Sequence, residues 1–261
     1  MPEGIVHVAA TGELATVTLD SPGKLNAISE SMWQALARTF AALSEQSQLR
    51  AVVIRGAGHN FAAGADIDEF ERVRGDAASG RRYHLETIAN ALDAISDCRV
   101  PVVAAIEGVC VGGGLEVAVA CDLRIAADSA RIGAPVGRIG FPLALPELGP
   151  LIRLVGPGVA SELLLEGRLL DAAEAAARGL VTRAVAVDRF EDEVHHCLTR
   201  IAAGSPRAAR ENKANIRRLA ASAGRYTEHD LDESFGFLES EDYREGVAAF
   251  VGKRPARFTG R

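Results

Sequence analysis

Short apolar segments, separated by polar stretches, predict β-strands along the first half of the chain. Residues 15–20 (ATVTLD) alternate between apolar and polar side chains, which is typical of a strand with one buried face. Three further segments are almost continuously apolar, and they span residues 50–56, 100–108 and 123–128. Such runs indicate strands that are buried on both faces, as in a parallel sheet covered by helices.

Helical periodicity fills the segments between these strands. One helix would begin after Ser29, a residue type that favours the N-cap position. Its buried face would carry the apolar residues at helical spacing, Trp33, Leu36, Phe40 and Leu43. The buried face of a second helix would carry Leu85, Ile88, Leu92 and Ile95. Strands that alternate with helices predict an α/β core with right-handed crossovers.

After residue 157 the pattern changes to helices only. Helix starts are expected at four positions that carry a capping residue, Asp171, Ser205, Thr227 and Ser240. Gly179 would end the first of these helices. From the pattern alone we expect an α/β core up to about residue 157, followed by a helical region that packs on this core or on a neighbouring chain.

Composition and charge narrow the range of functions. The chain has 261 residues, of which 48% are hydrophobic and 25% charged, so it can form one large domain with or without an appended helical piece. A formal net charge of −6 gives no electrostatic reason to expect binding to nucleic acid or to an anionic membrane. We see no signal peptide, and no apolar run approaches the roughly 20 residues of a membrane helix. A cytoplasmic protein without a membrane partner is expected.

Cysteine and histidine residues give no sign of a metal site. The four cysteines are scattered without zinc-site spacing, as expected for buried thiols in a reducing compartment, and they are Cys98, Cys110, Cys121 and Cys197. The six histidines show no pairing, and each is expected at the surface or in the core, namely His7, His59, His84, His195, His196 and His229. We therefore predict no metal ligand.

Two glycine-containing turns carry the most informative chemistry. They lie in residues 59–70 (HNFAAGADIDEF) and 108–122 (GVCVGGGLEVAVACD), where a buried strand passes to a helix that would start near Asp66 or Gly114. Helix starts leave backbone N–H groups unpaired and favour negative charge. Two such ends directed at one point would form an oxyanion hole. Close packing of helix on strand explains such turns equally well.

Glu116 follows the second glycine turn and falls on the first turn of the expected helix. A carboxylate beside an enolate-forming carbon can move a proton or orient a water molecule, especially if burial raises its pKa. The alternative is that Glu116 only interacts with the helix dipole. The GK[ST] ending of a phosphate loop and the GxSxG of a serine hydrolase are absent. Three acidic residues are expected to charge the first helix start rather than to catalyse, namely Asp66, Asp68 and Glu69.

These turns resemble the crotonase (enoyl-CoA hydratase/isomerase) superfamily. The likeness rests on FAAGADIDEF and AAIEGVCVGGGLEVAVACDLRIAADSARIGAP, and it continues in residues 25–29, 177–181 and 244–258. It implies an α/β fold with a crotonase-like spiral of ββα units in residues 1–195 and a C-terminal helical trimerisation region in residues 196–261. It also implies a homotrimer or a dimer of trimers. The substrate would be an acyl-CoA thioester, with coenzyme A as part of the substrate and no other cofactor.

The resemblance also implies roles for individual residues. The N–H groups of Ala65 and Gly113 would form the oxyanion hole, and Glu116 matches the first catalytic glutamate of the hydratases. The segments that would hold coenzyme A contain Lys24, Leu25, Ala27, Ala63, Asp66 and Ile67. Lys253 matches a C-terminal lysine that reaches a coenzyme A phosphate, often from a neighbouring subunit. A solvated charged tail is the alternative reading of Lys253.

The chain departs from the hydratases at their second glutamate, where it has Val136. Valine neither transfers a proton nor binds water, so hydration of a simple enoyl-CoA by Glu116 alone would be inefficient. The next segment, FPLALPELGPLIRL (141–154), is longer and apolar, and it contains Glu147. That residue either places a second carboxylate in the pocket or is an exposed loop charge.

Two classes of function remain open on these grounds. The first is an acyl-CoA enzyme of the hydratase/isomerase type, with an oxyanion hole and Glu116 as acid and base. Hydration is the family's commonest assignment, isomerisation needs only one base, and decarboxylation or thioester hydrolysis could also use one carboxylate. The second class is an acyl-CoA binding protein that kept the fold and lost the chemistry.

Overall fold

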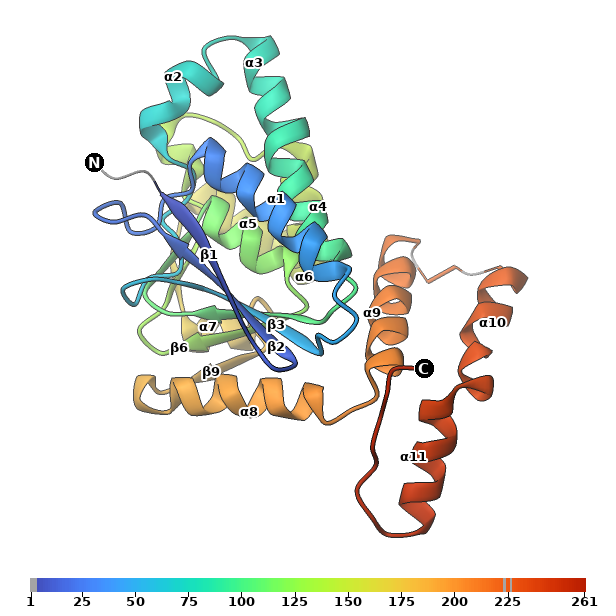
Figure 1. The fold of residues 1–261 in the computed structure, drawn as a ribbon. Coiled ribbons are helices and arrows are strands. Elements are labelled where there is room, and N and C mark those ends of the chain that lie inside the picture. Colours follow the sequence, from blue (N-terminus) through green and yellow to red (C-terminus); the bar gives the residue numbers. More distant parts are fainter. Residues whose placement is uncertain (1–3, 223, 226) are drawn as a thin grey trace.

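The computed structural model describes residues 4–222, 224–225 and 227–261, and its centre is a six-stranded sheet (Figure 1). The strands are β1 (Ile5–Thr11), β2 (Leu14–Asp20), β3 (Ala51–Gly56), β4 (Val102–Ile106), β6 (Leu123–Ala127) and β9 (Arg183–Val185). Their order is β1-β2-β3-β4-β6-β9, and all pairs are parallel except β1 with β2. The four predicted strands are confirmed as β2, β3, β4 and β6.

A second sheet has three strands in the order β5-β7-β8. They are β5 (Val109–Val111), β7 (Arg131–Gly133) and β8 (Leu170–Asp171). The chain passes from the first sheet to the second at Gly108, which has a φ of +52° between β4 and β5. A Cβ atom at this position would lie 2.4 Å from the carbonyl oxygen of His59, so only glycine allows this bend. The bend directs the chain into the second glycine turn.

Helices cover both faces of the large sheet (Figure 1). On one face lie α1 (Glu30–Ser44), α4 (Ala89–Asp97) and α5 (Gly113–Ala120), and on the other lies α8 (Phe190–Ala202). Strand β3 contributes to the apolar cores on both faces of the sheet. Val52 and Ile54 join the larger core, whereas Ala51 and Val53 pack with α8. Burial on both faces explains why this strand is a continuous apolar run.

Helix α1 confirms the first predicted helix. The Ser29 hydroxyl accepts a hydrogen bond from the Met32 N–H (3.3 Å) and so caps the helix. The four residues predicted to face the core are all buried, namely Trp33, Leu36, Phe40 and Leu43.

The second predicted helix is present but not uniform. It consists of α3 (Ala77–Arg82), a π-helical turn (Tyr83–Ile88) and α4. Ile88, Leu92 and Ile95 are buried as predicted, whereas Leu85 is 39% exposed, so its predicted burial is wrong. A π-helical turn accommodates an extra residue and rotates the preceding turns. Tyr83 therefore takes the buried position in place of Leu85.

The prediction that only helices follow residue 157 is wrong, because β8 and β9 lie in that region. These strands have two and three residues, too few to show a periodicity. β9 pairs with β6 and completes the edge of the large sheet. The α-helices of this half are α6 (Leu145–Ser161), α7 (Ala172–Ala177), α8, α9 (Pro206–Ala221), α10 (Glu228–Ser234) and α11 (Glu241–Val251).

The predicted caps in this half are confirmed. Each capping residue accepts a hydrogen bond from the backbone N–H three residues further on, and they are Asp171, Ser205, Thr227 and Ser240. Gly179 has a φ of 76° just beyond α7, as expected at the end of a helix. The remaining short helices are α2 (Phe70–Val73), the 3-10 turns Ile67–Glu69, Val136–Ile139, Val187–Arg189 and Gly236–Glu239, and the π turn Glu162–Glu166.

Residues 206–261 form a C-terminal arm in which α10 and α11 lie beyond α9, away from the large sheet (Figure 1). Lys213 connects α9 to the core, since its Nζ lies 2.7 Å from an Asp122 carboxylate oxygen and donates to the Val100 carbonyl (3.1 Å). The predicted boundary between residues 195 and 196 falls inside α8. Helix α8 packs against the sheet on both sides of this boundary, through Val194 and Cys197.

One helical run, Leu145–Glu166, is long and apolar enough to cross a membrane, with a mean hydropathy of 1.4 over its window. The prediction that no run approaches this length is therefore wrong, because α6 continues directly into a π turn. Length and composition alone are weak evidence for a membrane helix. Gly156, with a φ of 74°, breaks the regular helix inside the run. Helix α6 also packs against α5 and buries Leu151 and Ala160.

Candidate active site

The two glycine turns bring the backbone N–H groups of Ala65 and Gly113 close together. A Cβ atom on Gly113 would lie 3.3 Å from the Ala65 nitrogen, and one on Gly64 would lie 3.7 Å from the Gly113 nitrogen. Within the described part of the chain, neither N–H group donates a hydrogen bond. Both N–H groups thus lie close together and are free to donate to an oxygen atom of a ligand.

Short β-bridges hold these turns in place. Ile28 forms a parallel bridge with Ala65, in which the Ile28 N–H donates to the Gly64 carbonyl (2.7 Å). Ile28 bonds to the residues on either side of Ala65, because its carbonyl also accepts the Asp66 N–H. The N–H of Ala65 itself points away from Ile28 and stays available. A second bridge, between Ala62 and Cys110, joins the two turns directly.

The helices that follow the two glycine turns differ in length. Helix α5 begins at Gly113 and has eight residues, close to the predicted start at Gly114. The helix expected near Asp66 is instead a three-residue 3-10 turn followed by the four residues of α2. Asp66 caps this turn by accepting the Asp68 N–H (3.2 Å). Because so short a helix has little dipole, Ala65 would act through its hydrogen bond alone.

Glu116 lies on the first turn of α5 and is partly buried. Burial raises the pKa of its carboxyl well above the usual range, and the negative charge of Glu147 raises it further. The Arg74 guanidinium acts in the opposite direction but does not cancel these effects. The structure therefore brings Glu116 and Glu147 within electrostatic range of each other, from α5 and α6.

Glu147 is buried, with only 3% of its surface exposed, so it is not an exposed loop charge. One oxygen accepts the Ala144 N–H (3.2 Å) at the start of α6, and the other lies 2.5 Å from His84 Nδ1. The sequence predicted only that His84 lies at the surface or in the core, and it gave no sign of this contact with Glu147. The π turn, which carries His84, has no signature in the sequence, whereas π turns occur frequently at functional sites. Val136 is buried in a separate 3-10 turn.

Arg74 was also missed by the sequence patterns. Its guanidinium lies 4.0 Å from the centre of the Phe70 ring, 4.5 Å from that of Phe141 and 5.3 Å from that of Tyr83. Burial lowers the pKa of Arg74, while the charges of Glu147 and Glu116 partly offset this effect. Phe141 belongs to the segment before α6, which stands out in the sequence only as longer and apolar.

Trp33 and Tyr83 complete the surroundings of the hole. A Cβ atom on Gly113 would lie 2.9 Å from Cζ2 of Trp33, so the indole packs directly on this glycine. The indole Nε1 is buried without a hydrogen-bond partner among the described residues, although the Tyr83 hydroxyl lies beside it. Burial raises the pKa of Tyr83.

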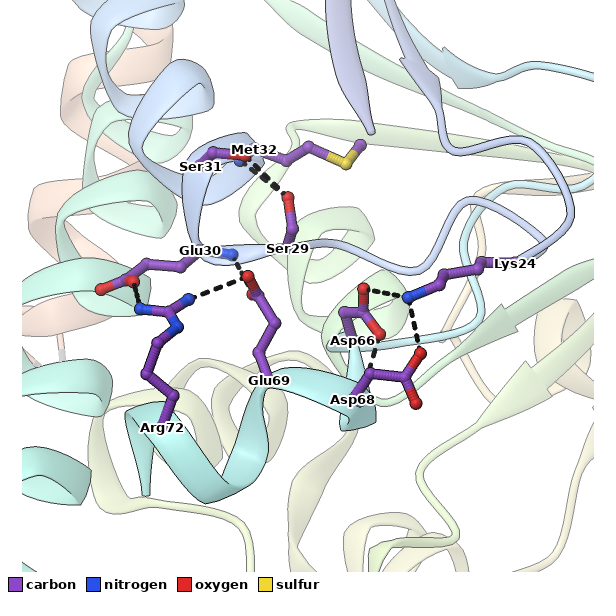
Figure 2. Close-up of polar contacts among 9 residues, drawn as sticks. All are labelled: Lys24, Ser29, Glu30, Ser31, Met32, Asp66, Asp68, Glu69 and Arg72. Carbon is purple, nitrogen blue, oxygen red and sulfur yellow. Dashed lines mark hydrogen bonds and ion pairs between the residues drawn. The ribbon is translucent and has the colours of Figure 1, made fainter. Parts of the chain in front are cut away.

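The segments predicted to hold coenzyme A lie together at one edge of these turns. Lys24 Nζ lies 2.7 Å from carboxylate oxygens of both Asp66 and Asp68, as Figure 2 shows. The Ala63 N–H donates to the Leu25 carbonyl (2.9 Å), which joins the two segments. Two apolar side chains are left exposed there, Leu25 at 51% and Ile67 at 58%, while Ala27 is buried.

A second ionic cluster, also visible in Figure 2, fixes this edge to the start of α1. Arg72 pairs with Glu30 and Glu69, and the Glu69 carboxylate accepts the Glu30 N–H (2.6 Å). The cluster anchors α2 and the preceding 3-10 turn, which follow Ala65 directly. It can therefore stabilise the position of the Ala65 N–H group.

Lys253 is not brought to these residues within one chain. It follows α11, at the opposite end of the molecule from α2 (Figure 1), and has a φ of 50°. Among the described residues, no group of three or more histidine, cysteine, aspartate or glutamate side chains could hold a metal ion. All four cysteines are buried and free, and burial raises the pKa of Cys121 to about 12.

Comparison with known proteins gives a consistent result. A family model described as enoyl-CoA hydratase/isomerase matches residues 9–261. A probable enoyl-CoA hydratase of Rhizobium meliloti is 35% identical over 260 residues and covers 97% of each chain. The short-chain-enoyl-CoA hydratase of Clostridium acetobutylicum is 30% identical over 254 residues and covers 93% of each chain. An enoyl-CoA hydratase/carnithine racemase from Magnetospirillum magneticum has a crystal structure that matches with a TM-score of 0.96 and 44% identity, over 100% of this chain and 97% of that one. The α/β fold expected from the sequence resemblance is confirmed.

Proposed function

Because this chain belongs to the enoyl-CoA hydratase/isomerase family, we propose that its reaction on acyl-CoA thioesters is the hydration of an enoyl-CoA. One observation supports hydration above the alternatives. The carboxyl groups of Glu116 and Glu147 interact electrostatically, and Glu116 lies on the same first turn of α5 as the free Gly113 N–H group. Glu147, from a position further along the chain, would thus take the place of the second hydratase glutamate, which is Val136 here.

In this reaction the thioester oxygen would accept hydrogen bonds from the Ala65 and Gly113 N–H groups. Negative charge develops on that oxygen as water adds to the β-carbon, and the two donors would stabilise it. Glu147 would accept a proton from the water, and Glu116 would deliver its proton to the α-carbon. The raised pKa of Glu116 keeps a proton available for this step. One proton transfer from Glu147 to Glu116 then restores the site.

His84 would act as a positioning residue for Glu147. Its Nδ1 contact and the Ala144 N–H together hold both oxygens of the Glu147 carboxylate. A carboxylate fixed in this way presents one orientation to the water molecule, which reduces the entropy lost on reaching the transition state.

Double-bond isomerisation is the second candidate, and the valine at position 136 favours it. An isomerase needs one base that removes a proton and returns it at another carbon, and Glu116 could do so alone. Glu147 would then serve only to raise the pKa of Glu116. Decarboxylation, thioester hydrolysis and non-catalytic binding make no use of the paired carboxyl groups.

Coenzyme A would bind as part of the substrate, with no further cofactor, along the edge formed by Lys24, Leu25, Ala27, Ala63, Asp66 and Ile67. The exposed Leu25 and Ile67 side chains offer apolar contact, and Lys24 offers charge. Lys253 would reach the coenzyme A phosphates from a neighbouring subunit of a trimer or a dimer of trimers. Its distance from α2 within one chain supports a contribution from another copy (Figure 1). We place the protein in the cytoplasm.

The proposal is tested by the turnover of crotonyl-CoA, followed as loss of the conjugated enoyl absorbance. We expect Glu116→Gln and Glu147→Gln each to lower kcat about 100-fold or more, the usual contribution of a positioned acid or base. Glu86→Gln, on the exposed side of the π turn, is the matched control and should keep the full rate. A fully active Glu147→Gln enzyme would refute the role of Glu147. If the wild type isomerises 3-enoyl-CoA but hydrates nothing, the second candidate replaces the first.

The same assay tests the oxyanion hole. A methyl group in Gly113→Ala would meet Trp33 at 2.9 Å and the Ala65 nitrogen at 3.3 Å, so the indole or the Ala65 backbone would have to shift and the two donors would lose their geometry. We expect a loss of kcat on the order of 100-fold, as for removal of one donor. Gly158→Ala is the control, because a Cβ atom there meets nothing within 4 Å.

A further inference from the structure

Arg74 is held in place by aromatic rings. Phe70 and Phe141 form an edge-to-face pair with ring centres 6.0 Å apart, and each ring lies within cation–π distance of the guanidinium. Rings contact the faces of a planar guanidinium, which leaves its N–H edge for hydrogen bonds. Arg74 is therefore positioned from α2 and from the segment before α6.

The N–H edge of Arg74 has no partner. Its side chain makes none of the ion pairs or side-chain hydrogen bonds found among the described residues, and its Nε is buried without an acceptor. Arg74 is half-buried, whereas Arg124 is fully buried and satisfies its guanidinium within the chain. It donates to the backbone carbonyls of Leu180, Cys121 and Ala118. A buried donor without an acceptor is costly, so the unsatisfied Nε of Arg74 points to a ligand that supplies an acceptor.

The protein carboxyl groups close to Arg74 are already occupied. Glu147 is held by His84 and by the Ala144 N–H. Glu116 forms no ion pair with Arg74 among the described residues, and burial raises the pKa of its carboxyl, which favours the neutral form. The Tyr83 hydroxyl, whose ring lies 5.3 Å from the guanidinium, is neutral. The guanidinium thus has carboxyl groups within electrostatic range but no ion pair with them among the described residues, so it can bind a carboxylate of a ligand.

Resting on the proposed function, we infer that the acyl group of the substrate carries a carboxylate and that Arg74 binds it. A carboxylate at the far end of the acyl chain would accept two parallel N–H bonds from the guanidinium. The thioester oxygen would occupy the oxyanion hole at the same time. The substrate class is therefore an enoyl-CoA derived from a dicarboxylic acid.

The same geometry argues against two other acyl groups. A quaternary ammonium group suits an aromatic cage, but here the rings are already occupied by the guanidinium, which would repel a second cation. A purely aliphatic chain would leave Arg74 without a partner and would bury it further. Arg74 therefore determines specificity through charge rather than through chain length.

The test compares the binding of three saturated thioesters by calorimetry, with free coenzyme A as the reference. The probes are glutaryl-CoA, pentanoyl-CoA of the same chain length and 4-(trimethylammonio)butyryl-CoA. Wild type should bind glutaryl-CoA about 10- to 100-fold more tightly than pentanoyl-CoA, as for a charged hydrogen-bonded pair. Arg74→Gln should remove this preference, and Arg74→Lys should keep part of it because the charge remains without the bidentate geometry.

The outcomes separate the two proposals. If pentanoyl-CoA or the ammonium thioester binds as tightly as glutaryl-CoA, or if Arg74→Gln keeps the preference, the inference is overturned while the proposed function stands. If no thioester binds more tightly than free coenzyme A, the proposed function fails as well. Should Arg74→Gln not fold, the order of the three affinities in the wild type decides the question.

Discussion

At the scale of single residues, the buried carboxyl group of Glu116 lowers the free energy of unfolding at neutral pH. Burial and the Glu147 carboxylate raise its pKa in the folded chain, whereas a glutamate in the unfolded chain has a pKa of about 4.3. Between these two pKa values the folded state holds a proton that the unfolded state has released. By linkage, the free energy of unfolding falls as the pH rises through this window. The loss is complete above the raised pKa.

We therefore expect Glu116→Gln to be more stable than the wild type at neutral pH. The gain should be on the order of 1 kcal/mol for each unit by which the pKa is raised, and it should vanish near about pH 4. Thermal unfolding measured by circular dichroism from pH 4 to pH 8 checks this expectation. A wild type that is the more stable protein at neutral pH, or a gap that does not change with pH, would contradict it.

At the scale of elements, the π turn at Tyr83–Ile88 determines which side chains reach the site. It lies between two α-helical stretches, and it places Tyr83 and His84 against the core side while Leu85 becomes exposed. Removal of one residue would convert this turn into regular α-helix and rotate the preceding residues about the helix axis. The contact of His84 with Glu147 would then be lost.

Deletion of Leu85 tests this interpretation. We expect activity on the preferred thioester to fall about 100-fold or more, because the acid–base pair loses its geometry, while the far-ultraviolet circular dichroism remains helical. Leu85→Ala is the matched control, since it shortens an exposed side chain without changing the register. Full activity in the deletion variant would mean that the π turn has no role in the site.

At the scale of the whole molecule, the C-terminal arm exposes large apolar side chains. Phe250 is 87% and Val251 76% exposed in the single chain, and both lie at the end of α11 next to Lys253. Apolar surface of this kind marks contact with another protein surface. In the proposed trimer or dimer of trimers, the same contact would bring Lys253 to the coenzyme A of a neighbouring subunit.

Phe250→Glu should therefore give monomers by analytical ultracentrifugation, whereas Phe250→Leu should keep the native mass. The monomer should also lose affinity for coenzyme A to the same extent as Lys253→Ala, because in both variants the lysine no longer reaches a neighbour. The comparison is made by calorimetry with free coenzyme A. Unchanged affinity in Lys253→Ala would refute the role of this lysine, and a monomeric wild type would refute the oligomer.

Several features of this chain follow from the sequence by itself, since they depend on residues close together in the chain. Strands β2, β3, β4 and β6 have clear apolar patterns, and the helix starts carry capping residues. The glycine-containing turns indicated unpaired N–H groups and the family resemblance assigned them to Ala65 and Gly113, which the structure places side by side. Residue pattern and backbone freedom act over a few residues, so they can be read along the chain.

Only the tertiary structure decided how distant residues combine. Strand β9 exists because β6 offers it an edge, and its three residues show no pattern of their own. The contacts of His84 with Glu147 and of Arg74 with Phe141 join segments 63 or more residues apart. A sequence pattern contains no distances between such segments, because loop paths and packing determine them. The motifs thus identified the family, and the fold determined which side chains lie together in the candidate site.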